Sequence, residues 1–228
     1  NASKTPLMIS MDAEWGVGMR LDSVPKFPWN MSLGAIKNDL LIEKIGLEIG
    51  YQFKRLGIHM NFAPVIDINT NPKNPIIGNR SYGENKISVS EKGISFTKGI
   101  QSNNVLATAK HFPGHGDTSK DSHLTLPTIN FDEKRIKKVE LYPFKKLIED
   151  GLSAVMIAHL NVPSLEKENM LPSTLSKNII EKTLIKELNF NGLIITDALE
   201  MKGVSEFTKK NVDPVSYTHL TLPTTPVV

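Results

Sequence analysis

The chain has 228 residues, of which 39% are hydrophobic, so it can build one large domain or two small ones around a sizeable core. Its net charge of +3 comes from 27 Lys and Arg against 24 Asp and Glu with no dense basic block, and this pattern does not favour nucleic-acid binding. The absence of cysteine excludes disulfides and thiolate chemistry, and no apolar run approaches the roughly 18 residues of a membrane span.

The chain opens at Asn1 in a polar segment, which predicts that the natural N-terminus and any signal peptide lie outside it. The sequence therefore does not decide between a periplasmic and a cytoplasmic location.

Short apolar runs alternate with longer amphipathic segments, the pattern of a parallel α/β protein. The predicted strands are Leu7–Met11, His59–Pro64, Leu106–Lys110, Ala154–His159 and Leu193–Thr196. The predicted helices are Leu33–Leu56, Glu91–Ser102, Asp132–Glu149 and Ser176–Leu188. Asp132 and Ser176 are typical N-caps, and Gly57 and Gly151 are typical helix stops.

Polar residues follow nearly every predicted strand. They are Asp12 and Glu14, then Asp67, then Lys110 and His111, then His159, and finally Asp197. In a (β/α)8 barrel all strands open on one face, whereas a doubly wound sheet gathers ligands at one switch point. Groups from five strands favour the barrel. Only five βα units are readable, so we expect an incomplete barrel over residues 1–214.

The last segment, residues 215–228, breaks the alternation and carries no charge. Its His-Leu-Thr-Leu-Pro-Thr at 219–224 repeats 123–128, but the residues before the two copies do not match, as those of a structural repeat should. The segment resembles the translation of a sequencing adapter, so we interpret it as non-native and leave His219 out of the site. A terminal repeat that caps the fold is the alternative.

The stretch Lys110-His-Phe-Pro-Gly-His-Gly-Asp-Thr-Ser-Lys-Asp-Ser-His-Leu-Thr-Leu-Pro127 is the richest in reactive side chains. A strand ends in Lys and His, a Pro-Gly turn follows, and a polar loop brings a second Asp and His. The spacing of His111 and His115 would suit a metal, but the Pro-Gly between them breaks any helix and a third ligand is not evident. Histidines that only satisfy backbone groups in the loop are a further alternative.

Asp121 and His123 stand two residues apart in this loop, so in an extended conformation their side chains point the same way. A neighbouring carboxylate orients an imidazole and favours its protonated form, which suits proton transfer near neutral pH. The pair is therefore a candidate acid/base.

Asp197 closes the apolar strand in Phe190-Asn-Gly-Leu-Ile-Ile-Thr-Asp-Ala-Leu-Glu-Met-Lys-Gly203. It has no adjacent Lys or Arg in the sequence, as befits a carboxylate that attacks a sugar carbon with oxocarbenium character. The alternative is that Asp197 only caps a following helix.

Together these stretches resemble glycoside hydrolase family 3, in its β-N-acetylglucosaminidase branch, over about residues 8–203. The signature Lys-His-Phe-Pro-Gly-His-Gly followed by Asp-Ser-His is highly specific. In that branch the acid/base is a loop histidine paired with an aspartate, whereas the β-glucosidase branch uses a glutamate from elsewhere. The resemblance implies a retaining glycosidase on a barrel fold that needs no cofactor and no metal.

The resemblance also assigns roles. Asp197 matches the nucleophile, and His123 with Asp121 matches the acid/base pair. The expected substrate contacts, some from motifs and one from its place at a strand end, are Asp12, Arg20, Arg80, Lys110, His111 and His159. The expected partner is a carbohydrate that contains N-acetylglucosamine, either a glycan or a muropeptide, and a missing C-terminal domain is also expected.

The sequence departs from the cell-wall-recycling enzymes of the family, which have Gln and Gly at Ala13 and Trp15 and often a second Asp at Ala198. The Asp-Ala-Glu-Trp-Gly form resembles variants found in Bacteroidota. Two alternatives to the hydrolase remain: a phosphorylase of the same family, in which phosphate replaces water, and a sugar-binding fragment without turnover.

Overall fold

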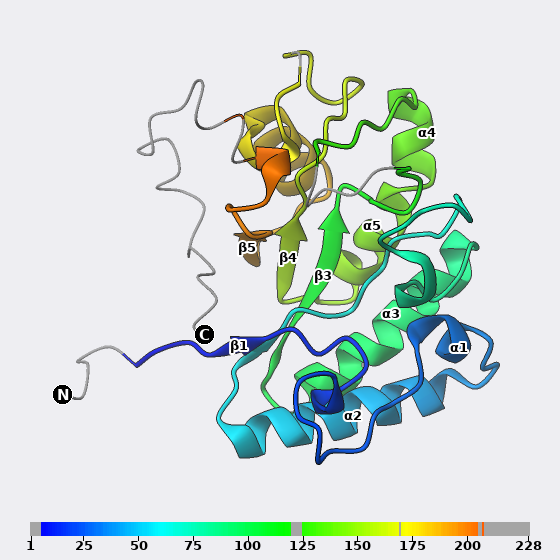
Figure 1. The fold of residues 1–228 in the computed structure, drawn as a ribbon, viewed down its shortest axis with the longest axis vertical. Coiled ribbons are helices and arrows are strands. Elements are labelled where there is room, and N and C mark those ends of the chain that lie inside the picture. Colours follow the sequence, from blue (N-terminus) through cyan, green and yellow to red (C-terminus); the bar gives the residue numbers. More distant parts are fainter. Residues whose placement is uncertain (1–5, 120–124, 169, 205–206, 208–228) are drawn as a thin grey trace.

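The computed structural model describes residues 6–119, 125–168, 170–204 and 207. Its centre is one parallel five-stranded sheet with the strands in chain order (Figure 1). They are β1 (Ser10–Met11), β2 (Met60–Asn61), β3 (Leu106–Phe112), β4 (Ala154–Ile157) and β5 (Leu193–Thr196). All four neighbouring pairs are parallel. The sheet is a half-barrel, which confirms the predicted α/β class and the incomplete barrel.

In the part of the chain that the structure describes, five α-helices and a π-helix connect the strands. They are α1 (Asn30–Gly34), α2 (Asp39–Leu56), α3 (Lys86–Gln101), α4 (Glu133–Lys138), α5 (Leu141–Glu149) and the π-helix η4 (Asn178–Glu187). Single 3-10 turns occur at η1 (Val17–Met19), η2 (Gly78–Arg80) and η3 (Ser173–Leu175).

Capping side chains explain where two predicted helix starts were wrong. The predicted helix 33–56 is divided because the Asn38 side chain accepts from the Leu40 N–H and starts α2 there. The Asn85 side chain accepts from Ile87 and Ser88, so α3 begins at Lys86 and not at residue 91. Both caps are short polar residues that the apolar periodicity does not register.

The predicted helix 132–149 is also two helices, α4 and α5. Asp132 caps α4 as predicted, through the Arg135 N–H. Pro143 lies in the first turn of α5, where its missing N–H costs nothing. At the other predicted N-cap, the Ser176 hydroxyl accepts from the Ile179 N–H just before η4.

The strand predictions located all five strands but misjudged several ends. The first two are shorter than predicted, covering only 10–11 and 60–61, whereas β3 runs two residues further, to Phe112. β4 ends at Ile157, two residues before His159, and β5 matches its predicted range. Polar side chains still follow the carboxyl ends of the strands as expected.

The main core lies between the sheet and the helices, of which α1, α3, α4 and α5 lie to the right of the strands in Figure 1 and α2 below them. Phe112 of β3 meets Phe144 of α5 edge-on, with ring centroids 5.0 Å apart. Where α2 crosses α3, Gly99 lies so close that a Cβ there would stand 2.2 Å from the Glu43 carbonyl oxygen. A second cluster, which includes Met60, Ala154, Met156 and Ile195, occupies the opposite face because strand residues alternate.

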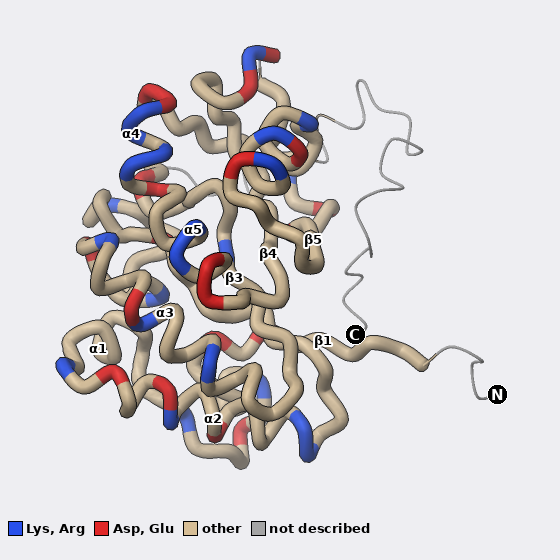
Figure 2. The backbone as a smooth tube through the Cα atoms, turned by 180° about the vertical axis from the view of Figure 1, so that it is seen from behind, with Lys and Arg blue, Asp and Glu red and all other residues tan. Residues whose placement is uncertain are grey.

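The described surface mixes charges of both signs. Figure 2 shows both basic and acidic segments on α4 and α5. No helix in the described part of the chain combines the length and apolarity needed to cross a membrane.

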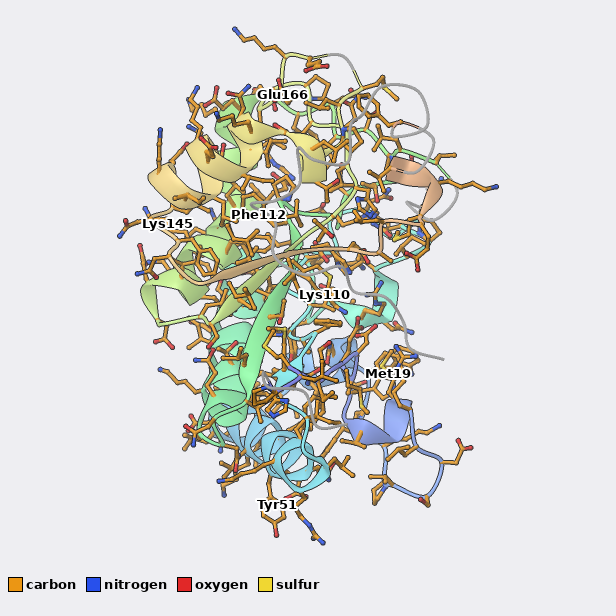
Figure 3. All side chains as sticks on the ribbon, turned by 90° about the vertical axis from the view of Figure 1, so that its left-hand side faces the viewer. Met19, Tyr51, Lys110, Phe112, Lys145 and Glu166 are labelled. Atoms are coloured by element: carbon orange, nitrogen blue, oxygen red, sulfur yellow. The ribbon has the colours of Figure 1, made fainter. Side chains whose placement is uncertain are left out.

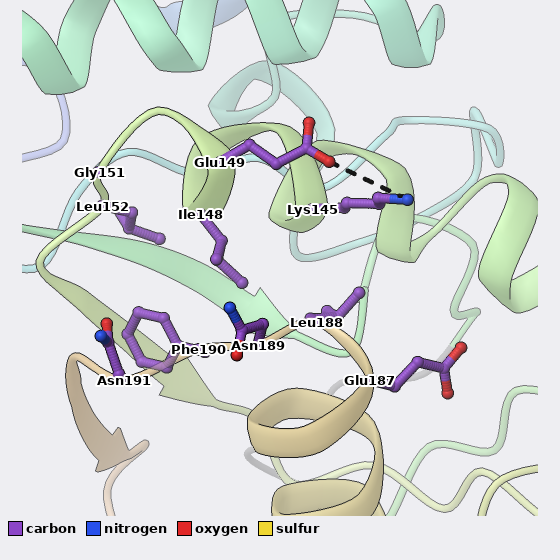
Figure 4. Close-up of a pocket in the computed structure, with 10 residues that line it drawn as sticks. All are labelled: Lys145, Ile148, Glu149, Gly151, Leu152, Glu187, Leu188, Asn189, Phe190 and Asn191. Atoms are coloured by element: carbon purple, nitrogen blue, oxygen red, sulfur yellow. Dashed lines mark ion pairs between the residues drawn. The ribbon is translucent and has the colours of Figure 1, made fainter.

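A cavity of about 590 Å³ opens between the end of α5 and the segment that leads into β5 (Figure 4). Ten residues line it: Lys145, Ile148, Glu149, Gly151, Leu152, Glu187, Leu188, Asn189, Phe190 and Asn191. They precede β4 and β5, so the cavity lies at the opposite end of the sheet from the polar side chains described next.

Candidate active site

The polar cluster begins with the segment that leaves β1. The side chain of Asn61 in β2 accepts from the Ala13 N–H and donates to the Ala13 carbonyl, both at 3.2 Å. This two-way clamp fixes the backbone between Asp12 and Glu14. Asp12 is partly exposed, whereas Glu14 is buried with 1% of its surface exposed.

Lys110, at the centre of the molecule in Figure 3, joins these two carboxylates. Its Nζ lies 2.8 Å from Asp12 Oδ1 and 2.7 Å from Glu14 Oε1. Arg20 holds Asp12 from the other side, with Nε donating to the Asp12 carbonyl and Nη2 lying 3.1 Å from Asp12 Oδ2. Asp12 and Lys110, which are 98 positions apart in the chain, thus become neighbours.

Arg80 grips Glu14 with two hydrogen bonds, from Nε at 2.9 Å and from Nη2 at 2.6 Å. The turn η2 carries it, and the Asn30 side chain holds that turn through the Arg80 carbonyl. Arg80 Nη2 also lies 3.2 Å from His111 Nε2. The guanidinium therefore connects the β1 segment with the end of β3.

The charges in this cluster change one another's proton affinity. Burial raises the pKa of the Glu14 carboxyl, but the charges and hydrogen bonds of Lys110 and Arg80 outweigh it and lower that pKa to about 2. Burial lowers the pKa values of Lys110 and Arg80, and the Glu14 carboxylate more than compensates and raises both. All three groups are consequently ionised at neutral pH.

Asp67, after β2, organises the histidine segment. Its carboxylate contacts His111 twice, at the backbone N–H and at Nδ1, where the distance to Oδ2 is 2.6 Å. It also accepts from the His115 N–H at 2.6 Å. Burial raises the Asp67 pKa, but the His111 charge and hydrogen bond reverse the shift and lower it. The carboxylate therefore stays ionised and fixes both histidines.

His115 is buried, and its Nδ1 lies 2.6 Å from the Thr118 hydroxyl. Burial is the main cause that lowers its pKa to about 4, with the His111 charge second. Close by, Gly116 lies against the Ile68 carbonyl, where a Cβ would come within 1.8 Å of the oxygen. No backbone with a side chain can follow the same path at this point.

Asp197 follows β5 directly. Its N–H donates to the Ile157 carbonyl, and its Oδ1 accepts from the Ala198 N–H at 2.8 Å. Burial raises the pKa of its carboxyl, while the His111 charge and the Ala198 N–H lower it below its ordinary value overall. The next helical residues begin at Lys202, so Asp197 does not cap a helix, and the capping alternative is wrong.

The structure thus brings most of the predicted site residues to one end of the half-barrel. Glu14 joins five of them into one continuous network of contacts: Asp12, Arg20, Arg80, Lys110 and His111. His159 lies beyond it and contacts the Ala198 carbonyl through Nε2. Asp121 and His123 lie outside the described residues.

Sequence reasoning left two members of the network without a role. Glu14 and Asp67 had been noted only as polar residues at strand ends, yet each holds two neighbours in the site. The sequence feature that could have indicated their roles is their position after β1 and β2, where the other site residues also follow strands. Within the described residues, no three His, Asp or Glu side chains come together as a metal site.

Residues 1–217 match the family described as glycosyl hydrolase family 3 N terminal domain. The beta-hexosaminidase A of Pseudoalteromonas piscicida is 38% identical over 220 residues, which are 90% of this chain and 37% of that protein.

Among solved structures, a glycoside hydrolase family 3 beta-N-acetylglucosaminidase from Paenibacillus sp. str. FPU-7 is 47% identical with a TM-score of 0.86. The match covers 89% of this chain and 39% of that one. A beta-glucoside phosphorylase is 30% identical with a TM-score of 0.85, covering 90% of this chain and 38% of the other. The chain therefore spans less than two fifths of the length of these three proteins.

Proposed function

Because the chain belongs to glycosyl hydrolase family 3 and resembles its beta-N-acetylglucosaminidases, we propose that it supplies the catalytic residues of a retaining β-N-acetylhexosaminidase. The substrate would be a glycan or muropeptide with a terminal β-linked N-acetylglucosamine. The reaction is a double displacement that needs no cofactor.

In the first step, the Asp197 carboxylate attacks C1 while the His123 imidazolium protonates the departing oxygen, giving a glycosyl-enzyme ester. In the second step, neutral His123 takes a proton from water, which attacks C1 and releases the sugar with retained β configuration. Asp121 orients the imidazole. The lowered pKa of Asp197 supports the nucleophile role because the group must be ionised at neutral pH.

The network around Lys110 would bind the sugar hydroxyls. Asp12 offers carboxylate oxygens, while Lys110, Arg80 and Arg20 offer N–H donors whose positions their ion pairs fix. Such fixed groups hold a ring against a nucleophile without further ordering. The observation that carries the proposal is that Asp197 directly follows β5, with its Oδ1 fixed by the Ala198 N–H, at the same end of the parallel sheet as Lys110 and His111 of β3.

The test is Asp197→Asn in the intact protein, with an aryl N-acetyl-β-glucosaminide as substrate. We expect kcat/KM to fall roughly 10³-fold or more, the scale seen when a nucleophile is removed. Asp22→Asn is the control, since Asp22 is an exposed carboxylate. Unchanged turnover in Asp197→Asn would refute the proposal, and a wild type that binds sugar without turnover would indicate a binding fragment.

A phosphorylase is the second candidate, favoured by the similarity to the beta-glucoside phosphorylase. In that reaction phosphate attacks the glycosyl-enzyme in place of water. Product analysis with and without inorganic phosphate separates the two functions. We expect free N-acetylglucosamine in both cases, and phosphate-dependent release of the sugar 1-phosphate would establish the phosphorylase.

A further inference from the structure

His159 is fully buried two residues after β4, and both of its ring nitrogens meet protein atoms. Nδ1 lies 2.9 Å from the Thr174 hydroxyl oxygen. Nε2 lies 2.8 Å from the carbonyl oxygen of Ala198, the residue after Asp197. A ring engaged on both sides in this way is placed to hold the backbone of the β5 loop.

The hydrogen-bond partners of His159 determine which of its ring nitrogens carries the proton. A carbonyl oxygen can only accept, so Nε2 must carry a proton and donate it to Ala198. In the neutral imidazole Nδ1 is then the acceptor, and the Thr174 hydroxyl donates to it. The Ala198 carbonyl thus selects the Nε2–H tautomer, and the Thr174 hydroxyl supports it because a hydroxyl can donate to the bare Nδ1.

Thr174 is itself anchored to the segment that carries His159. It lies in the turn η3, where the neighbouring Ser173 hydroxyl donates to the Ala158 carbonyl at 2.6 Å and accepts from the Leu160 N–H at 3.1 Å. Thr174 and Ser173 are both fully buried. Thr174, and with it the Nδ1 side of the ring, is therefore fixed relative to the segment that follows β4.

The bond to Ala198 acts on Asp197 through one residue. The Ala198 N–H donates to Asp197 Oδ1, and the Ala198 carbonyl accepts from His159, so hydrogen bonds hold Ala198 at both of its polar groups. We propose that His159 is a positioning residue that fixes the Asp197 carboxylate by holding the Ala198 carbonyl, and that it does not bind the sugar. The inference rests on the proposed role of Asp197 as nucleophile.

This assignment differs from the substrate contact expected from the position of His159 at a strand end. A sugar hydroxyl would have to displace Thr174 or Ala198 to reach a ring nitrogen. His159, although it follows β4, therefore holds the backbone that follows the neighbouring strand β5.

The kinetic test compares His159→Ala with His159→Gln in the intact protein. The alanine removes the side-chain donor to the Ala198 carbonyl and leaves only the backbone N–H of Met201 on it. Because a small displacement of a reacting group is costly, we expect kcat/KM to fall roughly 10–100-fold. The glutamine amide keeps one donor and one acceptor, so it should restore most of the lost activity. The inhibition constant of N-acetylglucosamine, which reports sugar binding, should stay the same in both variants.

Two results would overturn the inference. A higher inhibition constant in His159→Ala with unchanged kcat would show a sugar contact, and equal losses in the two variants would show that the donor to Ala198 is irrelevant. Thermal melts accompany each variant so that a folding defect is recognised.

A spectroscopic test does not depend on activity. Nitrogen-15 NMR of histidine-labelled protein, with the His159 signals assigned by their loss in His159→Gln, should show a proton on Nε2 and none on Nδ1. Thr174→Val should shift mainly the Nδ1 signal. An Nδ1–H tautomer would overturn the inference, whereas a wild type without turnover would overturn only the proposed function.

Discussion

Glu14→Gln tests the electrostatic centre of the site. The buried Glu14 carboxylate accepts two hydrogen bonds from Arg80 and lies 2.7 Å from Lys110 Nζ. Glutamine keeps the shape but removes the negative charge, so two largely buried cations lose their shared partner. Removing one member of a buried ion pair costs about 3–5 kcal/mol.

The lowered pKa gives a second measure of the same interaction. A shift of the Glu14 pKa from 4.5 to about 2 corresponds to about 3 kcal/mol of stability at neutral pH. This value agrees with the cost of breaking a buried ion pair. For a chain of this size, a loss of about 3 kcal/mol predicts a melting temperature about 6–12 °C lower in Glu14→Gln. Sugar binding should weaken as well, because Lys110 and Arg80 lose their fixed positions.

The assay is urea unfolding of wild type and Glu14→Gln across pH. Since the folded pKa lies below the unfolded one, the contribution is complete above pH 4.5 and disappears as the pH falls towards 2. The difference between the two proteins should therefore be about 3 kcal/mol at pH 7 and shrink below pH 4.5. Glu84→Gln, at an exposed position, is the control. A difference that stays constant with pH would refute the reasoning.

Two further predictions concern packing and the histidine segment. Gly99→Ala places a Cβ 2.2 Å from the Glu43 carbonyl oxygen, so we expect a loss of about 1–3 kcal/mol in urea unfolding, against almost none for Lys44→Ala on the exposed side of α2. The pKa of His115 is lowered to about 4, so between pH 6.5 and 4 its imidazole is protonated in the unfolded chain but not in the folded one. The free energy of unfolding should therefore fall as the pH drops from 6.5 to 4. His115→Gln should remove this part of the pH dependence, and an unchanged slope would contradict the assignment.

The sequence was most informative about the sheet. Apolar runs bounded by polar residues located all five strands of the described sheet, most clearly β4, whose four residues are apolar and buried as expected for a parallel strand covered on both faces. Helix limits were less predictable, since single side chains such as Asn38 and Asn85 decide where α2 and α3 begin. The Asn38 cap acts through one hydrogen bond and the Asn85 cap through two, and neither leaves a periodic trace in the sequence.

Within the site, the sequence indicated which residues follow the strands but not which of them touch. Lys110 contacts Asp12 and Glu14, which lie nearly a hundred positions earlier, and this pairing depends on the register of β1, β2 and β3. His159 shows the limit most clearly. The sequence predicts its place at a strand end, but the contacts of its ring with Thr174 and Ala198 depend on the three-dimensional fold.

The pairing of charges also bears on whether water or phosphate completes the reaction. In the described part of the site, Arg20, Arg80 and Lys110 each already contact a carboxylate. A phosphate anion entering beside the sugar would have to share a cation whose charge is largely neutralised, and the nearby carboxylates would repel it. Water needs no such cation and only a general base. We therefore infer that the charges of the described network favour the proposed hydrolysis, which gives the expected release of free sugar a physical basis separate from the resemblance to known hexosaminidases.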